Sequence, residues 1–529
     1  MIEVVKTSEI AEIARQQEHE NSRMRFKLIQ SKYLDLNKEF KPFEKDLEKF
    51  TESDYIKLKP LILENNITSI QKNIEEGKLS YEKLILFYLY RIRKFEKDTT
   101  KRLNAIISLN PNILKEAKEK DRQRLLGKVN SQIYGMPILV KDNIDIITMA
   151  TTAGAVVFKD NLPQKDAFII ERLKKSGALI LGKVNLSEWA YFFCNDCPLG
   201  YSATGGQTLN PYGRKRFETG GSSAGSGVAV AANYAVAAVG TETSGSITSP
   251  SSLNSVVGLK PTIGFLSRSG IVPISSTLDT PGPMTKNVVD NAILLEAMIG
   301  FDVLDSTTTI ANKLPNDYFN LNWSNEYLEG KKIGVLTQLL TDSIYKKSVH
   351  KIKGSKAVIV ELSPDEMNYE GFLNLLTTEM KHDLPHYIKS SGNDSLKVSN
   401  VKDIVKFNSL DLVKRAPYGQ DLFEGIVADR TSVKKLSEIK NKLQKEGEKY
   451  LEALITKKVD VVVSINNNHS AVAAVAKLPT LTVPMGYKET GEPISLTFIG
   501  RPLSENELLK LGYAFEQLTK VRKIPNDYQ

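Results

Sequence analysis

Short runs of mostly apolar residues alternate with amphipathic stretches through the middle of the chain. These runs lie at 138–140, 178–181 and 236–239, and two more lie near the C-terminal end at 459–463 and 481–483. Such runs are typical of strands buried on both faces, and the stretches between them have helical spacing. The pattern predicts an α/β core in which helices connect the strands of one sheet. A last amphipathic helix is expected over about 503–520.

Two regions carry a different pattern, rich in lysine and with scattered apolar residues. Residues 1–64 predict amphipathic helices that lie on a larger body, and we interpret them as an N-terminal helical extension of a domain spanning 65–529. Residues 302–455 have the same texture. They predict a helical insertion within that domain, or one wall of a cleft.

Local signals define two helices near the start of this domain. Ile67, Ile70 and Ile74 share helical spacing, and Gly77 follows them as a residue suited to a left-handed helix cap. Ser80 then offers an N-cap side chain to a second helix with a wide apolar face.

The composition describes a folded globular protein without a marked charge. The 529 residues are 41% hydrophobic and 25% charged, and 71 basic against 62 acidic residues give a net charge of +9. This profile excludes a disordered chain and a small disulfide scaffold. Lysines and glutamates are interspersed, which is typical of a solvated surface, so no nucleic-acid partner is expected.

The chain shows no signal for a membrane or for export. No apolar stretch approaches the roughly 18 residues that a membrane span needs. The first residues lack the basic-then-apolar layout of a secretory signal. This fits a cytoplasmic protein, or an exported one whose signal has been removed.

The two cysteines, Cys194 and Cys197, form a C-x-x-C motif, which can be a redox pair or half of a zinc site. No histidine lies nearby in the sequence to complete a zinc site, and the following Pro198 does not fit the start of a redox helix. We therefore expect two ordinary loop or core thiols.

Three familiar motifs appear in altered form. Residues 177–184 imitate a phosphate-binding loop, but their middle is an apolar strand and the last residue is a valine. Residues 382–386 imitate the helix of a zinc protease, but Pro385 is expected to break that helix, which favours two surface histidines. Ser223 fits a nucleophile elbow, but residues 213–220 before it are too polar to form the buried strand that an elbow needs.

A lysine is the better candidate for a catalytic base. Lys141 ends an apolar run and is expected at the tip of a buried strand. A lysine with a pKa near ~10.4 is a poor base at neutral pH, but burial disfavours the ammonium and can lower the pKa by several units. The alternative is a lysine paired with Asp142 or Asp145, which strand alternation disfavours.

Two loops of small residues offer nucleophiles. They span 220–227 and 241–246, and the second follows a predicted strand. A turn of small residues after a strand allows consecutive N–H groups to converge on one point, as in an oxyanion hole. The alternative is that these serines and glycines only form turns.

Several segments, taken in order, resemble the amidase signature family. They are 135–143 (GMPILVKDN), 220–226 (GGSSAGS), 240–246 (GTETSGS), 256–262 (VVGLKPT), 278–284 (LDTPGPM) and 482–486 (TVPMG). Ser222 and Ser246 stand 24 positions apart (246 − 222), as do two serines of that signature. The resemblance covers most of the chain from about 65 to 300 and again from 458 to 520.

The resemblance implies a fold and a set of site residues. The family's fold is a single α/β domain whose mixed, mostly parallel central sheet is covered by helices on both sides. Its Ser–cis-Ser–Lys triad would make Ser246 the acylated nucleophile, Ser222 the proton bridge after a cis peptide bond, and Lys141 the base. The oxyanion hole would consist of four backbone N–H groups, those of Thr243, Ser244, Gly245 and Ser246. Neither a cofactor nor a metal is implied.

Within the family, residues 242–247 and 267–274 look closest to the peptide amidase branch. Those enzymes hydrolyse the C-terminal carboxamide of peptides to an acid and ammonia, so the expected partner is a small peptide amide or another carboxamide. Thr248 replaces an arginine of many members, which argues against a glutamyl-tRNA amidotransferase A-type subunit. That subunit and a fatty-acid or aryl-acyl amidase remain the alternatives.

Overall fold

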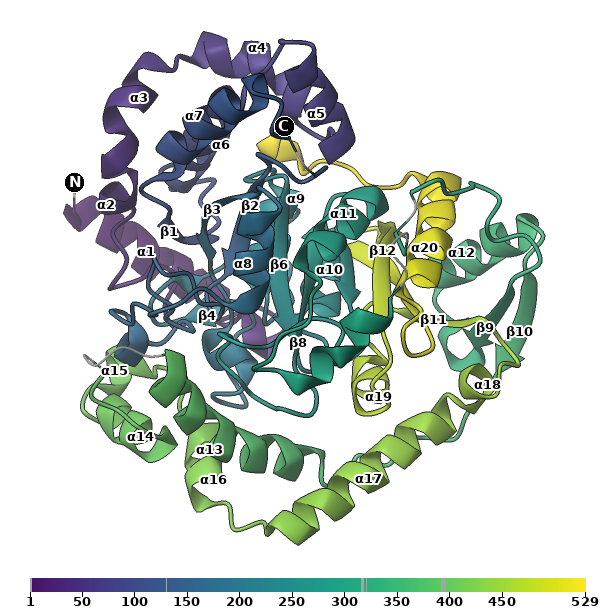
Figure 1. Cartoon of the computed structure of the whole chain (residues 1–529). Coiled ribbons are helices and arrows are strands. Elements are labelled where there is room, and N and C mark those ends of the chain that lie inside the picture. Colours follow the sequence, from purple (N-terminus) through teal and green to yellow (C-terminus); the bar gives the residue numbers. More distant parts are fainter. Residues whose placement is uncertain (1, 130, 315–317, 320, 392–395) are drawn as a thin grey trace.

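A mixed sheet runs through the molecule (Figure 1). The structure is a computed structural model that describes residues 2–129, 131–314, 318–319, 321–391 and 396–529. Within these residues the sheet has 11 strands in the order β1-β3-β2-β6-β8-β7-β12-β13-β11-β9-β10. The strands are β1 (Ile106–Leu109), β2 (Pro137–Lys141), β3 (Leu179–Val184), β6 (Ala237–Glu242), β7 (Val257–Lys260), β8 (Thr280–Thr285), β9 (Lys332–Leu336), β10 (Val358–Leu362), β11 (Val461–Ile465), β12 (Thr480–Tyr487) and β13 (Pro493–Ile499). Two short strands, β4 (Tyr201–Ser202) and β5 (Gly206–Gln207), pair separately.

The expected α/β architecture with a mixed sheet is confirmed. Parallel pairing joins β3, β2 and β6 on one flank and β11, β9 and β10 on the other, and the centre of the sheet is antiparallel. Each of the five apolar runs of the sequence overlaps a strand, namely β2, β3, β6, β11 or β12. Strands β12 and β13 are antiparallel because only a short turn connects them.

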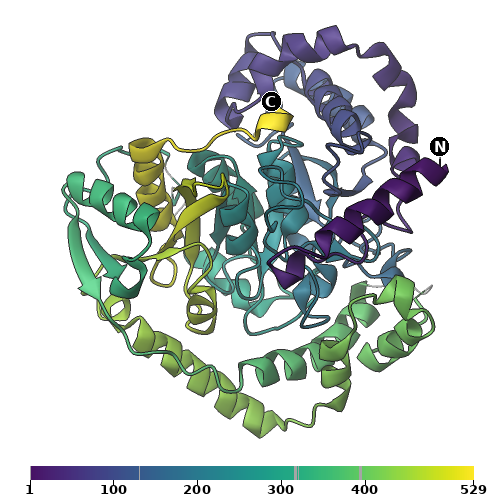
Figure 2. The same cartoon turned by 180° about the vertical axis from the view of Figure 1, so that it is seen from behind.

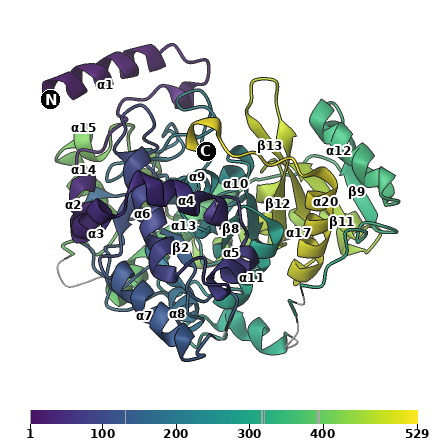
Figure 3. The same ribbon diagram turned by 90° about the horizontal axis from the view of Figure 1, so that it is seen from above.

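Helices cover both faces of the sheet. Helices α8 (Phe168–Lys175), α11 (Val288–Met298) and α20 (Glu505–Thr519) lie on one side, and α9 (Ala224–Ala231) and α10 (Thr248–Leu253) on the other (Figure 3). Helix α20 is the predicted last helix. The small residues of α9 permit a close approach to its neighbours, since a Cβ at Gly225 would lie 2.5 Å from the backbone nitrogen of Asn185.

Residues 2–64 lie along the outside of the molecule (Figures 1 and 2). They form α1 (Ile2–Gln16), α2 (Leu36–Phe40), α3 (Glu44–Lys49) and α4 (Glu52–Ile62). The segment between α1 and α2 is mostly irregular, and it is fixed by buried Met24, Phe26 and Ile29. Helix α1 is attached to the body by an ion pair of 2.9 Å between Glu12 and Lys215.

The two helices expected next are confirmed. Helix α5 (Ile67–Glu75) is followed by Gly77 with a φ of 71°, in the left-handed region. Ser80 caps α6 (Tyr81–Glu96), and its side chain accepts a hydrogen bond of 3.2 Å from the N–H of Lys83. Helix α7 (Ile113–Leu125) packs against α6.

Residues 302–455 are only partly helical, which corrects the expectation for this region. Strands β9 and β10 extend the sheet at its edge, next to α12 (Ser343–Gly354). The sequence hid them because Gly334 interrupts the short run of β9, and Val358 and Glu361 of the edge strand β10 are exposed. The helices from α13 onward form an arm along the lower side of the molecule in Figure 1. They are α13 (Phe372–Ser391), α14 (Val401–Ser409), α15 (Leu412–Arg415), α16 (Asp421–Ala428), α17 (Val433–Tyr450) and α18 (Glu452–Ile455).

The prediction that Pro385 breaks its helix is wrong. Pro385 lies inside α13, which continues to Ser391. Burial of Leu384 and Tyr387 on the same helix offsets the hydrogen bond that a proline cannot donate. His382 and His386 are exposed, as expected for surface histidines.

Candidate active site

Lys141 lies at the carboxyl end of β2 and points toward the end of the neighbouring strand β6. Its Nζ is 2.8 Å from Ser222 Oγ, 2.8 Å from Thr241 Oγ1 and 3.2 Å from the carbonyl oxygen of Thr241. Because β2 and β6 are parallel, both strands deliver their last residues to the same edge of the sheet. The lysine side chain is completely buried.

The environment of Lys141 brings its titration close to neutral pH, so that a substantial fraction of the amine is neutral there. Burial lowers the pKa of Lys141 to about 7, against the opposing effect of the negative charges of Asp279 and Glu242. The alternative pairing partners are engaged elsewhere. Asp142 forms an ion pair with Lys183, and Asp145 accepts a hydrogen bond of 2.8 Å from the hydroxyl of Tyr387.

Ser222 lies in the loop that leads into α9, after a cis peptide bond between Gly221 and Ser222. Its carbonyl oxygen accepts a hydrogen bond of 3.0 Å from the N–H of Ser187. A Cβ at Gly221 would lie 2.5 Å from Ser187 Oγ, so the close contact of the two loops requires glycine there. The next N–H, that of Ser223, donates to the carbonyl oxygen of Ser246 at 3.1 Å, which brings the two serine loops together.

Ser246 lies in the loop between β6 and α10, which the carboxylate of Glu242 organises from inside. Glu242 Oε1 accepts the N–H of Gly245 at 2.7 Å. Glu242 Oε2 accepts the N–H groups of Ile247 at 2.7 Å and Thr248 at 2.9 Å. Three backbone donors therefore compensate a buried carboxylate at the turn of the loop.

The loop leaves three of the four expected oxyanion donors available. The N–H of Gly245 donates to Glu242 and is therefore not free to bind a substrate oxygen, contrary to the expectation for this residue. The N–H groups of Thr243, Ser244 and Ser246 have no hydrogen-bond acceptor in the described part of the chain. Free donors at positions 243, 244 and 246 of one turn, beside a serine hydroxyl, have the chemistry of an oxyanion hole.

Thr248 is one of the residues that bond the Glu242 carboxylate. Its N–H and its hydroxyl both donate to Glu242 Oε2, the hydroxyl at 3.2 Å. The negative charge of Glu242 is thus stabilised by hydrogen bonds from the loop itself. Within the described residues no arginine pairs with Glu242.

Two polar side chains of the site went unnoticed in the sequence. Thr241 bonds Lys141, and Asn143 Nδ2 donates to Thr241 Oγ1 at 3.0 Å. Asn143 stands two residues after Lys141, on the stretch where β2 leaves the sheet, and Thr241 is the last residue but one of β6. Their positions at the carboxyl ends of adjacent parallel strands are the signal that would have identified them.

The rejected candidates do not form a second site. Ser223 Oγ lies between the carbonyl oxygen of Thr241 at 3.0 Å and its N–H at 3.2 Å. Lys183, at the end of the false phosphate loop, lies in β3. Within the described residues, no group of three or more His, Cys, Asp or Glu side chains is arranged to hold a metal ion.

The expectation of two free thiols at Cys194 and Cys197 is wrong, because they form a disulfide. The C-x-x-C spacing permits this pairing, and the sequence alone gave no reason to choose it over free thiols. The disulfide loop contacts the helical arm. The N–H of Asn195 donates to Asp421 Oδ1 of α16 at 3.2 Å, and the rings of Phe193 and Phe423 lie 5.1 Å apart.

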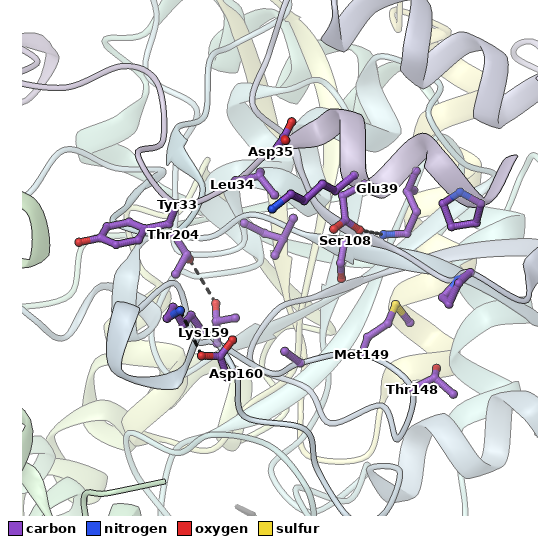
Figure 4. A pocket seen from close by; sticks show the side chains of 17 residues that line it. Tyr33, Leu34, Asp35, Glu39, Ser108, Thr148, Met149, Lys159, Asp160 and Thr204 are labelled. Carbon is purple, nitrogen blue, oxygen red and sulfur yellow. Dashed lines mark hydrogen bonds and ion pairs between the residues drawn. The ribbon is translucent and has the colours of Figure 1, made fainter. Parts of the chain in front are cut away.

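One cavity of the described structure lies away from Lys141 and the two serines. It has a volume of about 470 Å³ and separates the segment 33–42 from β1 and from residues 148–160 (Figure 4). Lys159 and Asp160 pair with each other at 3.1 Å on its wall. No residue of the Lys141–Ser246 site lines it.

In the described part of the chain, no helix has the length and apolar character that crossing a membrane requires.

The family model, a sequence relative and two solved structures that this chain matches are all amidases. The family model described as Amidase matches residues 83–465. A probable amidase from Arabidopsis thaliana is 33% identical over 479 residues, which are 88% of this chain and 92% of that protein. An amidase family protein from Bacillus anthracis superposes with a TM-score of 0.89 at 36% identity, covering 94% of this chain and 99% of the other. Peptide amidase from Stenotrophomonas maltophilia superposes with a TM-score of 0.81 at 36% identity, covering 88% and 99%.

Proposed function

The chain belongs to the amidase family and is an amide-hydrolysing enzyme, and we propose that it cleaves the C-terminal carboxamide of peptides to a free acid and ammonia. The proposed catalytic residues are Ser246, Ser222 and Lys141. The observation that carries the proposal is the contact of 2.8 Å between Lys141 Nζ and Ser222 Oγ, made by a buried amine whose pKa is lowered to about 7.

The proposed acylation begins with neutral Lys141. Lys141 accepts the proton of the Ser222 hydroxyl while Ser222 accepts that of Ser246, and Ser246 Oγ attacks the amide carbon. The C–N bond breaks when the same relay returns a proton to the leaving nitrogen, which departs as ammonia. Water then attacks the ester on Ser246, transfers its proton to the relay, and releases the acid.

The proposed oxyanion site consists of the N–H groups of Thr243, Ser244 and Ser246. The carbonyl oxygen of the substrate becomes negative in the tetrahedral intermediate, and donors already held in place stabilise that charge without reorganisation. Loss of one such donor costs roughly 3–4 kcal/mol in the transition state. Glu242 supports the proposal because it fixes the turn from which these donors project.

The proposed substrate class follows from similarity to the peptide amidase of Stenotrophomonas maltophilia, which extends over 88% of this chain. The replacement of arginine by Thr248 agrees with this choice over an amidotransferase subunit. We also propose that residues 65–529 form one domain, to which 1–64 add an extension.

The test is ammonia release from an amidated dipeptide, with the corresponding free acid as a blank. We expect release by the wild type and none above background by Ser246→Ala and Lys141→Ala. Oleamide and an acyl anilide run beside it, and faster turnover of either would replace the peptide substrate by a fatty-acid or aryl-acyl amide. Full activity of Ser246→Ala would overturn the assignment of the nucleophile.

A further inference from the structure

The loop that carries the proposed oxyanion donors is held by a second carboxylate besides Glu242. The hydroxyl of Thr243 donates to Asp279 Oδ1 at 2.5 Å. Asp279 directly precedes β8, which pairs with β6, so it reaches the loop from the neighbouring strand. The loop is thus fixed from inside by Glu242 and from across the sheet by Asp279.

Asp279 is itself held in one orientation. Its other oxygen, Oδ2, accepts the N–H groups of Ile274 at 2.8 Å and Ser275 at 2.9 Å. With Oδ2 engaged by two donors, Oδ1 is directed at Thr243. The carboxylate therefore connects residues 274–275 to the loop of Ser246 by hydrogen bonds.

The segment before Asp279 is fastened to the helical arm. Glu379 of α13 bonds the hydroxyl of Ser275 and accepts the N–H of Thr277 at 3.1 Å. Asp383, one turn further along α13, accepts the N–H of Ser276 at 2.9 Å. Glu379 is in turn paired with Lys440 of α17 at 2.5 Å. These contacts make the segment a rigid support for Asp279.

We propose that Asp279 is a positioning residue of the reaction, which holds the oxyanion loop through the Thr243 hydroxyl and places a negative charge opposite Lys141. The proposal rests on the proposed function for its role in turnover. Burial raises the pKa of Asp279 to about 6 and the hydrogen bond from Thr243 opposes that shift, so the contact also helps to keep the carboxylate charged.

The charged groups around Asp279 determine how the loss of its negative charge changes the pKa of Lys141. Lys141, Glu242 and Arg268 face this part of the site, and Arg268 is itself bound by Asp305 at 2.7 Å. Further out lie the α13 side chains Glu379, Asp383 and His386. Asp279 and Glu242 both raise the pKa of Lys141. Loss of the Asp279 charge therefore lowers the pKa of Lys141, and the lysine stays neutral at lower pH.

The experiment compares four variants by the pH dependence of kcat/KM for an amidated dipeptide. Asp279→Asn keeps the size of the side chain and removes its charge. We expect its acid limb to move down by about 1 pH unit. Its kcat should fall about tenfold with little change in KM, because oxyanion donors act in the transition state.

Thr243→Val removes the contact and leaves the carboxyl group in place, although that carboxyl loses a hydrogen bond that lowers its pKa. We expect kcat to fall about tenfold, as in Asp279→Asn, with an acid limb within about half a pH unit of wild type. Thr243→Ser restores the hydroxyl and should recover the wild-type rate. Asp383→Asn is the matched control, since its amide oxygen still accepts the N–H of Ser276 and only a charge is lost. It should match the wild type in kcat and in the acid limb.

Two results would overturn the proposal. One is an unmoved acid limb in Asp279→Asn, which reduces the residue to a structural role. The other is an equal change in Asp383→Asn, which means that any charge in the region acts alike. A second measurement does not depend on turnover: the pKa of Lys141 read from the ¹³Cε shift of labelled lysine, with the signal identified by Lys141→Met. This pKa must fall in Asp279→Asn, and an unchanged value refutes the charge contact even if the wild type releases no ammonia.

Discussion

Asp142 forms its ion pair with Lys183, 3.3 Å away on β3, although its neighbour in the chain is Lys141. Both partners are completely buried, and Asp142 also accepts the N–H of Thr152 at 3.3 Å. Within the described residues Lys141 has no carboxylate in direct contact. Two adjacent residues thus have different surroundings: Asp142 is paired with Lys183, and Lys141 is surrounded by two hydroxyls and a carbonyl oxygen, which tolerate a neutral amine.

Removal of Lys183 tests this pairing. Lys183→Met leaves the Asp142 carboxylate buried without its partner, which should lower the free energy of unfolding by about 3–5 kcal/mol. Guanidinium denaturation measures the loss. The double variant Asp142→Asn/Lys183→Met removes the uncompensated charge and should regain most of the stability. Equal stability of Lys183→Met and wild type would show that the pair does not exist.

The acid limb of the activity follows the titration of Lys141. The relay needs a neutral amine, and the pKa of Lys141 is about 7, so kcat/KM should fall about tenfold per pH unit below that value. Above it the rate should level off. A steady-state profile from pH 5 to 9 checks this. Activity that stays constant down to pH 5 would mean that another base accepts the proton.

The titration of Lys141 should also make the free energy of unfolding depend on pH, in a direction that follows from its lowered pKa. Between the folded pKa of about 7 and the unfolded value near ~10.4, the unfolded chain binds more protons, so wild-type stability rises with pH across this window. Lys141→Met lacks this contribution. Its gain in stability over wild type should be largest below pH 7 and shrink by about 4 kcal/mol toward pH 10.4. A difference that does not vary with pH would contradict a buried, neutral Lys141.

Glu242 should matter through the geometry of the loop. In Glu242→Gln an amide N–H₂ faces at least one of the backbone N–H groups that the carboxylate now accepts, so the turn of Ser246 is distorted. We expect kcat to fall about 100-fold with a small change in KM. Glu505→Gln is the control, since Glu505 is also buried and accepts a backbone N–H, that of Thr262, away from the site. A similar loss in both variants would indicate general destabilisation.

Much of the fold could be predicted because its strands are buried on both faces. The runs at 138–140 and 236–239 are continuous and apolar, and they correspond to the interior strands β2 and β6. Strand β10 was missed for the opposite reason: it lies at the edge of the sheet, none of its residues is buried, and Val358 and Glu361 are exposed. Pro385 was misjudged because the loss of one backbone hydrogen bond is a local cost, whereas the packing of α13 is a tertiary gain.

The residues of the candidate site also fall into those that the sequence could identify and those that depend on tertiary contacts. The family motifs identified Lys141, Ser222 and Ser246 as candidates, because each of them lies in a short segment whose sequence is characteristic of the family. Thr241 and Asp279 lie in the same segments, but their partners are set by strands that meet only in the folded molecule. The engagement of the Gly245 N–H by Glu242 depends on loop geometry that residue types do not encode.

The most direct test of the central claim is to trap the acyl intermediate and locate it. The enzyme is mixed with an amidated peptide, quenched in acid within milliseconds, digested and analysed by mass spectrometry. Our account predicts an acyl ester on Ser246 in the wild type and none in Ser246→Ala or Lys141→Ala. An ester on Ser223, or on any residue other than Ser246, would contradict it.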